Sequence, residues 1–125
     1  MRDIFFKAKR LDNGEWVEGY IFKVWDRTYI LWGTTNDIPN MIEVDALTVS
    51  EFTGLTDRNG TKIFEGDIVN IYWKNNIICC GDIRYNEQDC RFVIFEDYIF
   101  PYGFDKTNDL EVIGNIHDNP ELLGE

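Results

Sequence analysis

The stretch GLTDRNGTKIFEGDIV, residues 54–69, decides the fold. Its Asn59-Gly60 pair can adopt the positive φ angles of a tight hairpin turn. Glu65-Gly66-Asp67 predicts a second turn, because Gly66 accepts a positive φ without steric cost. The following residues 68–73 are rich in Ile, Val, Tyr and Trp, which predicts a strand. Two turns around short apolar runs therefore predict β-structure.

The same stretch could instead hold a ligand, because Asp57-Arg58-Asn59-Gly60 resembles the middle of an EF-hand loop. If Gly60 took the glycine position of that loop, the first and last ligand positions would fall on Leu55 and Gly66. Neither residue carries a carboxylate. A phosphate-binding loop is excluded too, because the spaced upstream glycine and the following Ser or Thr are missing. We interpret the glycines as turn positions and predict no cofactor.

The rest of the chain consists of short β-rich runs between turn signals such as Asn13-Gly14 and Asn75-Asn76. This spacing is typical of a barrel or a sandwich. No helical stripe of three turns is present, and residues 41–52 stay ambiguous. At the end of the chain, Asn119 and Pro120 resemble an N-cap and first helical position, which predicts a short C-terminal helix.

Charge is unevenly distributed over the 125 residues. Twelve basic and 23 acidic residues give a net charge of −11, which disfavours direct binding of DNA or RNA phosphates. Residues 1–10 are the exception, with four basic residues against Asp3 and thus a net charge of +3. We interpret this segment as a solvated edge strand, with nucleic-acid binding as the alternative. The basic residues in question are Arg2, Lys7, Lys9 and Arg10.

The cysteines and the apolar runs of the sequence indicate in which cellular compartment the protein is expected. Cys79, Cys80 and Cys90 are odd in number and form no C-x-x-C motif, which favours a reduced, cytoplasmic setting. The first residues lack the apolar region of a signal peptide, and the longest apolar runs span four residues. We predict no membrane span. Exposed strand edges make a homo-oligomer an open alternative.

Few residues could carry out catalysis. The chain contains one serine, Ser50, and one histidine, His117, so a nucleophile with a base is poorly supported. A single histidine and no cysteine pair also disfavour a zinc site. Glu65 and Asp67 form a carboxylate pair that keeps a small hydrolase as an alternative. We predict no catalytic, cofactor-binding or metal-binding residues.

Aromatic residues concentrate in FEDYIFPYGF, residues 95–104. We favour a loop folded over the mouth of a barrel. The alternative is an exposed protein-contact surface, because Tyr and Phe anchor many interfaces. Its candidate contact residues are Phe95, Tyr98, Phe100, Tyr102 and Phe104.

One turn and three longer blocks of the sequence resemble known proteins and make the expected fold more specific. The Glu65-Gly66-Asp67 turn resembles the diverging turn of SH3-type barrels. Three blocks together resemble the YopX family of phage and prophage proteins: residues 1–19, 52–69 and 111–123. The first block departs at Ala8-Lys9-Arg10, where relatives carry an Ala-Trp-Asp-like run. The resemblance implies an SH3-type C-terminal part and a β-rich N-terminal part, with no established activity and no catalytic residues.

We therefore expect a mainly β protein, with a β-rich subdomain over residues 1–50 and a small SH3-type barrel with a short C-terminal helix over residues 51–125. The expected function is that of a non-enzymatic phage or prophage accessory protein in the bacterial cytoplasm, acting through contacts with a host or phage protein. One alternative is an acidic DNA mimic that occupies a DNA-binding protein. The other is the hydrolase with a carboxylate site.

Overall fold

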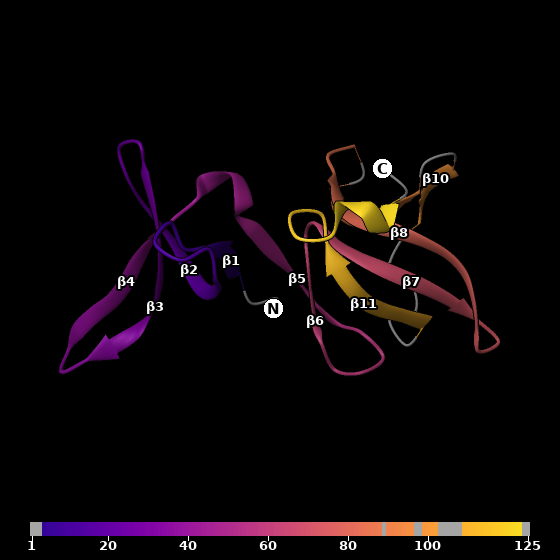
Figure 1. The fold of residues 1–125 in the computed structure, drawn as a ribbon, viewed down its shortest axis with the longest axis horizontal. Helices are drawn as coiled ribbons and strands as arrows, with labels where there is room; N and C mark the ends of the chain where they lie inside the picture. Colours follow the sequence, from indigo (N-terminus) through magenta and orange to yellow (C-terminus); the bar gives the residue numbers. More distant parts are fainter. Residues whose placement is uncertain (1–3, 89, 97–98, 103–108, 124–125) are drawn as a thin grey trace. The chain divides into compact units, whose positions relative to one another are not determined.

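A computed structural model describes residues 4–88, 90–96, 99–102 and 109–123 (Figure 1). Most of these residues lie in strands, which confirms the predicted mainly β fold. The strands are β1 (Phe6–Lys9), β2 (Trp16–Val24), β3 (Arg27–Thr35), β4 (Ile38–Val44), β5 (Ser50–Thr56), β6 (Lys62–Phe64), β7 (Asp67–Trp73), β8 (Asn76–Asn86), β9 (Arg91–Glu96), β10 (Ile99–Tyr102) and β11 (Leu110–Asn115). The described residues also include the short 3-10 helices η1 (Ala46–Thr48) and η3 (Pro120–Leu123).

The strands form two antiparallel sheets. The first has the order β4-β3-β2-β1-β5-β6, and the second has the order β10-β9-β8-β7-β11. The chain divides into two compact units, an N-terminal unit (Met1–Phe52) and a C-terminal unit (Thr53–Glu125). Strand β5 contributes residues to both, and its first residues pair with β1. Because β1 pairs with β2 on one side and β5 on the other, the predicted edge strand is wrong for Phe6–Lys9.

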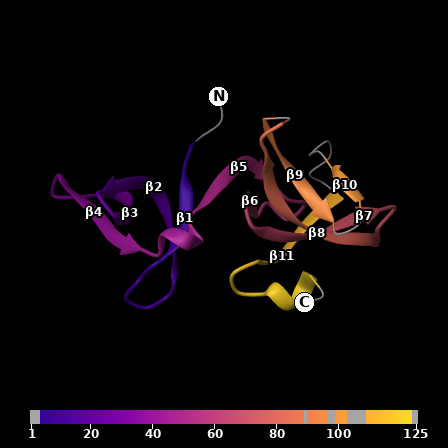
Figure 2. The same ribbon diagram turned by 90° about the horizontal axis from the view of Figure 1, so that it is seen from above.

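Strands β1 to β4 of the N-terminal unit bend around a small core. Ala8, Ile30 and Val44 are almost completely buried on one face of the sheet. Arg10 forms a bridge with Val44, which brings the end of β1 to β4 (Figure 2). The N–H of Leu11 donates to the carbonyl of Glu43 at 3.2 Å, close to this bridge. One face of the sheet is thus turned inward and the other outward.

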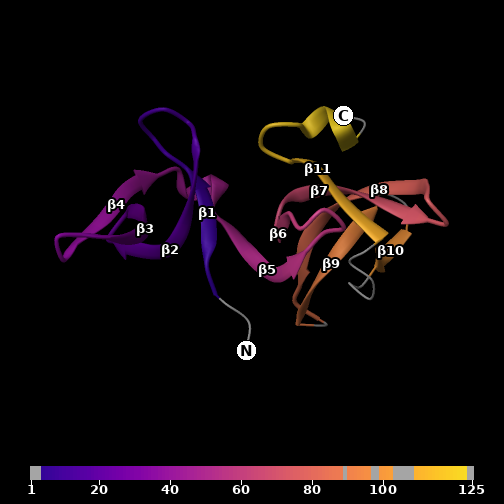
Figure 3. The same cartoon turned by 90° about the horizontal axis from the view of Figure 1, so that it is seen from below.

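The core of the C-terminal unit lies along β7, β8 and β9. Its buried members are Ile63, Val69, Ile83, Phe92, Ile94 and Leu110. Strand β11 returns to pair with β7, as Figure 3 shows. Turns are present at the predicted sites: Gly60 and Gly66 have φ angles of 81° and 87°. The β7–β8 turn lies at Lys74 and Asn75, with φ angles of 50° and 66°, one residue before the predicted Asn75-Asn76 pair. The β7–β8 turn joins two strands that pair directly.

The predicted C-terminal helix is wrong. Pro120–Leu123 forms only a short 3-10 helix, in which the N–H of Leu122 donates to the carbonyl of Asn119 at 3.0 Å. The side-chain Oδ1 of Asn119 accepts the N–H of Asn115 at 3.3 Å, so it does not cap a following helix. So short a segment offers too few hydrogen bonds to offset the cost of nucleating an α-helix.

The closed SH3-type barrel is not confirmed. Among the described residues, the strand pairings link β10 to β11 through β9, β8 and β7 as an open sheet. The ambiguous segment of residues 41–52 is mostly extended, with only η1 between β4 and β5.

Candidate functional site

In the loop that resembles an EF-hand, the carboxylate of Asp57 binds backbone N–H groups of the protein itself. The buried carboxylate of Asp57 accepts hydrogen bonds at Oδ1 from the N–H groups of Asn59 (2.8 Å) and Thr61 (2.9 Å). Its Oδ2 accepts the N–H of Val112 in β11 at 2.8 Å. Both oxygens are therefore occupied, and the carboxylate joins the β5–β6 loop to β11.

The second turn is built in the same way. Asp67 is buried, and its Oδ2 accepts the N–H of Phe64 at 2.8 Å. The N–H of Gly66 donates to the carbonyl of Ile83 at 2.8 Å, and the N–H of Ile116 donates to the carbonyl of Gly66 at 2.9 Å. Asp67, one of the two carboxylates of the hydrolase alternative, thus stabilises a turn inside the C-terminal unit.

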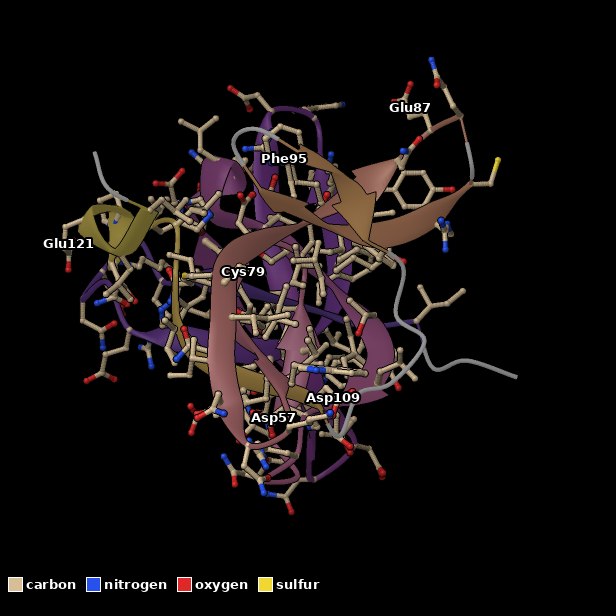
Figure 4. The ribbon with its side chains drawn as sticks, turned by 90° about the vertical axis from the view of Figure 1, so that its right-hand side faces the viewer. Asp57, Cys79, Glu87, Phe95, Asp109 and Glu121 are labelled. Atoms are coloured by element: carbon tan, nitrogen blue, oxygen red, sulfur yellow. The ribbon has the colours of Figure 1, made fainter. Side chains whose placement is uncertain are left out.

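The candidate aromatic segment is only partly described. Phe95 is half-buried in β9, and the guanidinium of Arg84 lies 3.7 Å from the centre of its ring. Arg84 also binds the buried Asp82, with an Nε–Oδ2 distance of 2.7 Å. Figure 4 shows Phe95 and Asp57 at opposite ends of the C-terminal unit.

Tyr98 and Phe104 lie outside the described residues, and for Phe100 and Tyr102 the description covers only the backbone of β10. The contact surface predicted from residues 95–104 therefore stays a prediction.

The residues considered for catalysis or metal binding lie on different elements. The hydroxyl of Ser50 is buried and donates to the carbonyl of Thr48 at 3.0 Å. Cys79 and Cys80 are half-buried, and Cys90 is exposed in the turn after β8. Within the described residues, no group of three or more His, Cys, Asp or Glu side chains could hold a metal ion. The same part of the chain contains no helix long and apolar enough to span a bilayer.

Tyr72 forms the most distinct side-chain network of the C-terminal unit. Its hydroxyl donates to Oε1 of Glu111 at 2.7 Å, and the guanidinium of Arg58 lies 4.2 Å from the centre of its ring. The hydrogen bond to Glu111 raises the pKa of Tyr72 above its usual value, and partial desolvation acts in the same direction. The network links β7 to β11, because the hydroxyl of Tyr72 binds Glu111 and the ring of Tyr72 contacts Arg58.

The largest unexplained feature is the outward face of the N-terminal sheet. Strand register places Tyr20 beside Leu31 and Leu31 beside Met41, so one apolar row crosses β2, β3 and β4. The next row contains Phe22 and Tyr29, whose ring centres are 6.4 Å apart. We call this surface the outer face. It comprises Trp16, Tyr20, Phe22, Val24, Tyr29, Leu31 and Met41.

The outer face is substantially exposed to solvent. Tyr20 is 58% exposed, Phe22 46%, Val24 42% and Met41 44%. The outward face of an antiparallel sheet usually carries polar side chains, because it meets water. Here the inward residues of β2, such as Ile21, are apolar as well. Strand β2 thus has two apolar faces, of which only one is used in the core.

Charged residues of both signs border the outer face. Lys7 is the register partner of Glu18, and the ammonium groups of Lys7 and Lys9 lie 4.7 and 5.5 Å from the ring centre of Trp16. At the other end of β2, Arg27 is the partner of Val24. The pKa of Arg27 is raised, chiefly by a side-chain hydrogen bond with Tyr29 and also by the charge of Glu43.

Sequence reasoning did not single out this surface. The β-rich runs between the turn signals predicted strands, but they did not show which face of a strand would stay uncovered. A signal was present in YIFKV, residues 20–24, where residues of both parities are apolar. Such a run indicates either a strand buried on both faces or one with an exposed apolar face.

Comparisons with known proteins place the chain in a family. No curated protein matches it. Its structure is similar to the crystal structure of protein EF1440 from Enterococcus faecalis, with a TM-score of 0.56 and 23% identity over 98% of this chain and 99% of that chain. At this identity the similarity concerns the fold alone. The family model of the YopX protein matches residues 6–124, which is nearly the whole chain. The chain therefore belongs to the YopX family.

Proposed function

We propose that this chain is a non-enzymatic phage or prophage accessory protein that acts through protein–protein contacts made by its outer face. The observation that carries the proposal is the exposure of Tyr20, Phe22, Val24 and Met41 on adjacent strands. Burial of such side chains on binding is favourable, because apolar surface leaves water.

The size of the outer face suits a contact surface. With about 200 Å² for a large side chain, the four exposed residues present roughly 400 Å² of mainly apolar surface. Apolar patches of roughly 300–600 Å² are the largest on a typical monomer and are often functional. Tyr20 and Phe22 also belong to the rigid aromatic residues that bury large areas and anchor interfaces.

We further propose that the C-terminal unit is an SH3-type scaffold. The proposal is supported by the Glu65-Gly66-Asp67 turn and by the consecutive antiparallel strands β7, β8 and β9. The turn carboxylates Asp57 and Asp67 are both occupied by backbone N–H groups. In this reading the C-terminal unit has a structural role, and recognition lies in the N-terminal unit.

Site-specific photo-crosslinking tests the proposed contact surface. A photoreactive residue replaces Tyr20, and the matched control replaces Lys23, which lies on the same strand, points to the opposite side and is also exposed. We expect protein adducts from position 20 in host cells that express the full chain, and far fewer from position 23. Equal adduct yields at both positions, or none at either, would contradict the proposal.

The acidic DNA mimic is a second candidate, favoured by the charge of the C-terminal unit. Residues 53–125 contain six basic and fourteen acidic residues, which gives a net charge of −8. Closely spaced carboxylates can imitate phosphates toward a DNA-binding protein. Binding of this kind weakens as salt is added, because ions screen exposed charges. Capture of a DNA-binding protein that is insensitive to salt would contradict this candidate.

A further inference from the structure

We infer that the occupant of the outer face is a second copy of this chain, related to the first by a two-fold axis. The inference rests on the proposed function, in which the outer face makes the protein contact. It adds the identity of the partner and the symmetry of the contact.

The shape of the outer face favours another sheet as its partner. The face is three strands wide in the row of Tyr20, Leu31 and Met41, and two strands wide in the row of Phe22 and Tyr29, which ends at Glu43 on β4. A single helix or extended peptide covers a narrow strip, whereas a second sheet packs face to face about 10 Å away and covers every row. A copy of the same three strands has the matching width.

The exposed area agrees with a symmetric dimer. A standard interface buries about 800 Å² per partner, of which roughly 55–65% is apolar. This corresponds to roughly 450–500 Å² of apolar surface on each side, close to the roughly 400 Å² that the four exposed side chains supply. The half-buried Trp16, Tyr29 and Leu31 add to that area. Each copy therefore supplies the apolar surface that a standard dimer needs.

The charges along the outer face are complementary under the same symmetry. Glu18 lies toward one end of β2, and Arg27, the neighbour of Val24, lies at the other end. A two-fold axis across the strands between Tyr20 and Phe22 places the Glu18 end of one copy over the Arg27 end of the other. The same operation places Tyr20 over Phe22 twice. An isologous contact thus brings Glu18 of each copy toward Arg27 of the other, while Lys7 and Lys9 lie beside Glu18 and Glu43 lies beside Arg27, so that both signs of charge are present at each end.

Net charge also favours contact through the N-terminal units. Residues 1–52 contain six basic and nine acidic residues, a net charge of −3, against −8 for residues 53–125. Two copies repel each other less through the N-terminal units than through the C-terminal units. The outer face is therefore the apolar surface that two copies can bring together at lower electrostatic cost.

Analytical ultracentrifugation of the full chain over a concentration series tests the inference. We expect a dimer that dissociates on dilution, and a dissociation constant at least about tenfold higher for Phe22→Glu. The matched control is Ile77→Glu in β8, an exposed apolar residue of the other unit, which should leave the dimer unchanged. A monomeric wild type, or a dimer that is broken by Ile77→Glu but not by Phe22→Glu, would overturn the inference.

Charge reversal tests the symmetry without removing an aromatic residue. Glu18→Arg and Arg27→Glu should each weaken the dimer, and the double variant should restore it. Additive weakening in the double variant would overturn the two-fold arrangement. The crosslinking result separates the two proposals: a monomeric chain that still forms adducts from position 20 with another protein refutes only the second copy, whereas the absence of position-20 adducts refutes the proposed function itself.

Discussion

Replacing Asp57 should destabilise the C-terminal unit far more than the loss of an ordinary loop carboxylate. Asp57 is 5% exposed and accepts three backbone hydrogen bonds, from Asn59, Thr61 and Val112. Hydrogen bonds to a charged group contribute about 1.5–3 kcal/mol each. Asn59 and Thr61 are exposed, so water can replace two of the bonds, while the N–H of Val112 is half-buried and loses its partner. We expect Asp57→Ala to cost about 3–4 kcal/mol.

Asp57→Asn separates the contributions of the two oxygens. An amide retains an acceptor for Asn59 and Thr61, but its NH₂ group then faces the N–H of Val112. We expect a loss of about 2 kcal/mol, less than for alanine. The matched control is Asn86→Ala in the same unit, where Oδ1 accepts the N–H of Gln88 at an exposed turn. That change should cost less than about 1 kcal/mol.

Urea unfolding followed by circular dichroism gives the free energies, and amide hydrogen exchange of Val112 gives the local effect. Exchange at Val112 should accelerate in both Asp57 variants and stay unchanged in Asn86→Ala. The reasoning is refuted if Asp57→Ala stays within about 1 kcal/mol of the wild type and Val112 remains protected. The carboxylate would then be dispensable for the fold, and a ligand role would have to be reconsidered.

Two further predictions concern other parts of the chain. Gly19→Ala should destabilise the N-terminal unit by more than about 2 kcal/mol in urea unfolding, because the new Cβ would lie 2.3 Å from the carbonyl oxygen of Leu31. The control is Gly14→Ala, whose Cβ would meet no atom within 4 Å. This change should cost only about 1 kcal/mol, because an alanine is strained at the positive φ of Gly14. Tyr72 should ionise above the usual pH of about 10, and Glu111→Gln should lower its pKa in an ultraviolet titration. Since the folded pKa is raised, the stabilisation by Tyr72 is present below pH of about 10 and is lost as the pH rises through the folded pKa.

The turns were predictable from the sequence because their conformations are local. Gly14, Gly60, Gly66 and Asn75 all have positive φ angles in the structure, as their residue types and flanking runs predicted. The role of Asp57 was predictable only in part. Its bonds to Asn59 and Thr61 follow from the local turn, but Val112 lies 55 residues away in the sequence. Only the folded chain brings that partner to the carboxylate.

The outer face was not predictable for a related reason. The sequence shows that residues 20–24 carry apolar side chains of both parities, but exposure depends on what the rest of the fold covers. The C-terminal helix was mispredicted because cap residues alone do not make a helix. With Asn119 bonded back to Asn115 and only a short segment remaining, a 3-10 helix satisfies the same backbone groups.

The bridge between Arg10 and Val44 has a consequence for growth of the protein into fibres. An uncovered edge strand offers a template to which further chains can add without limit. On β4, Leu11 already occupies the carbonyl of Glu43, and Pro39 has no N–H to donate. Addition of a further strand is therefore hindered at these two positions of β4, so that amyloid-like fibres should not start readily from this edge.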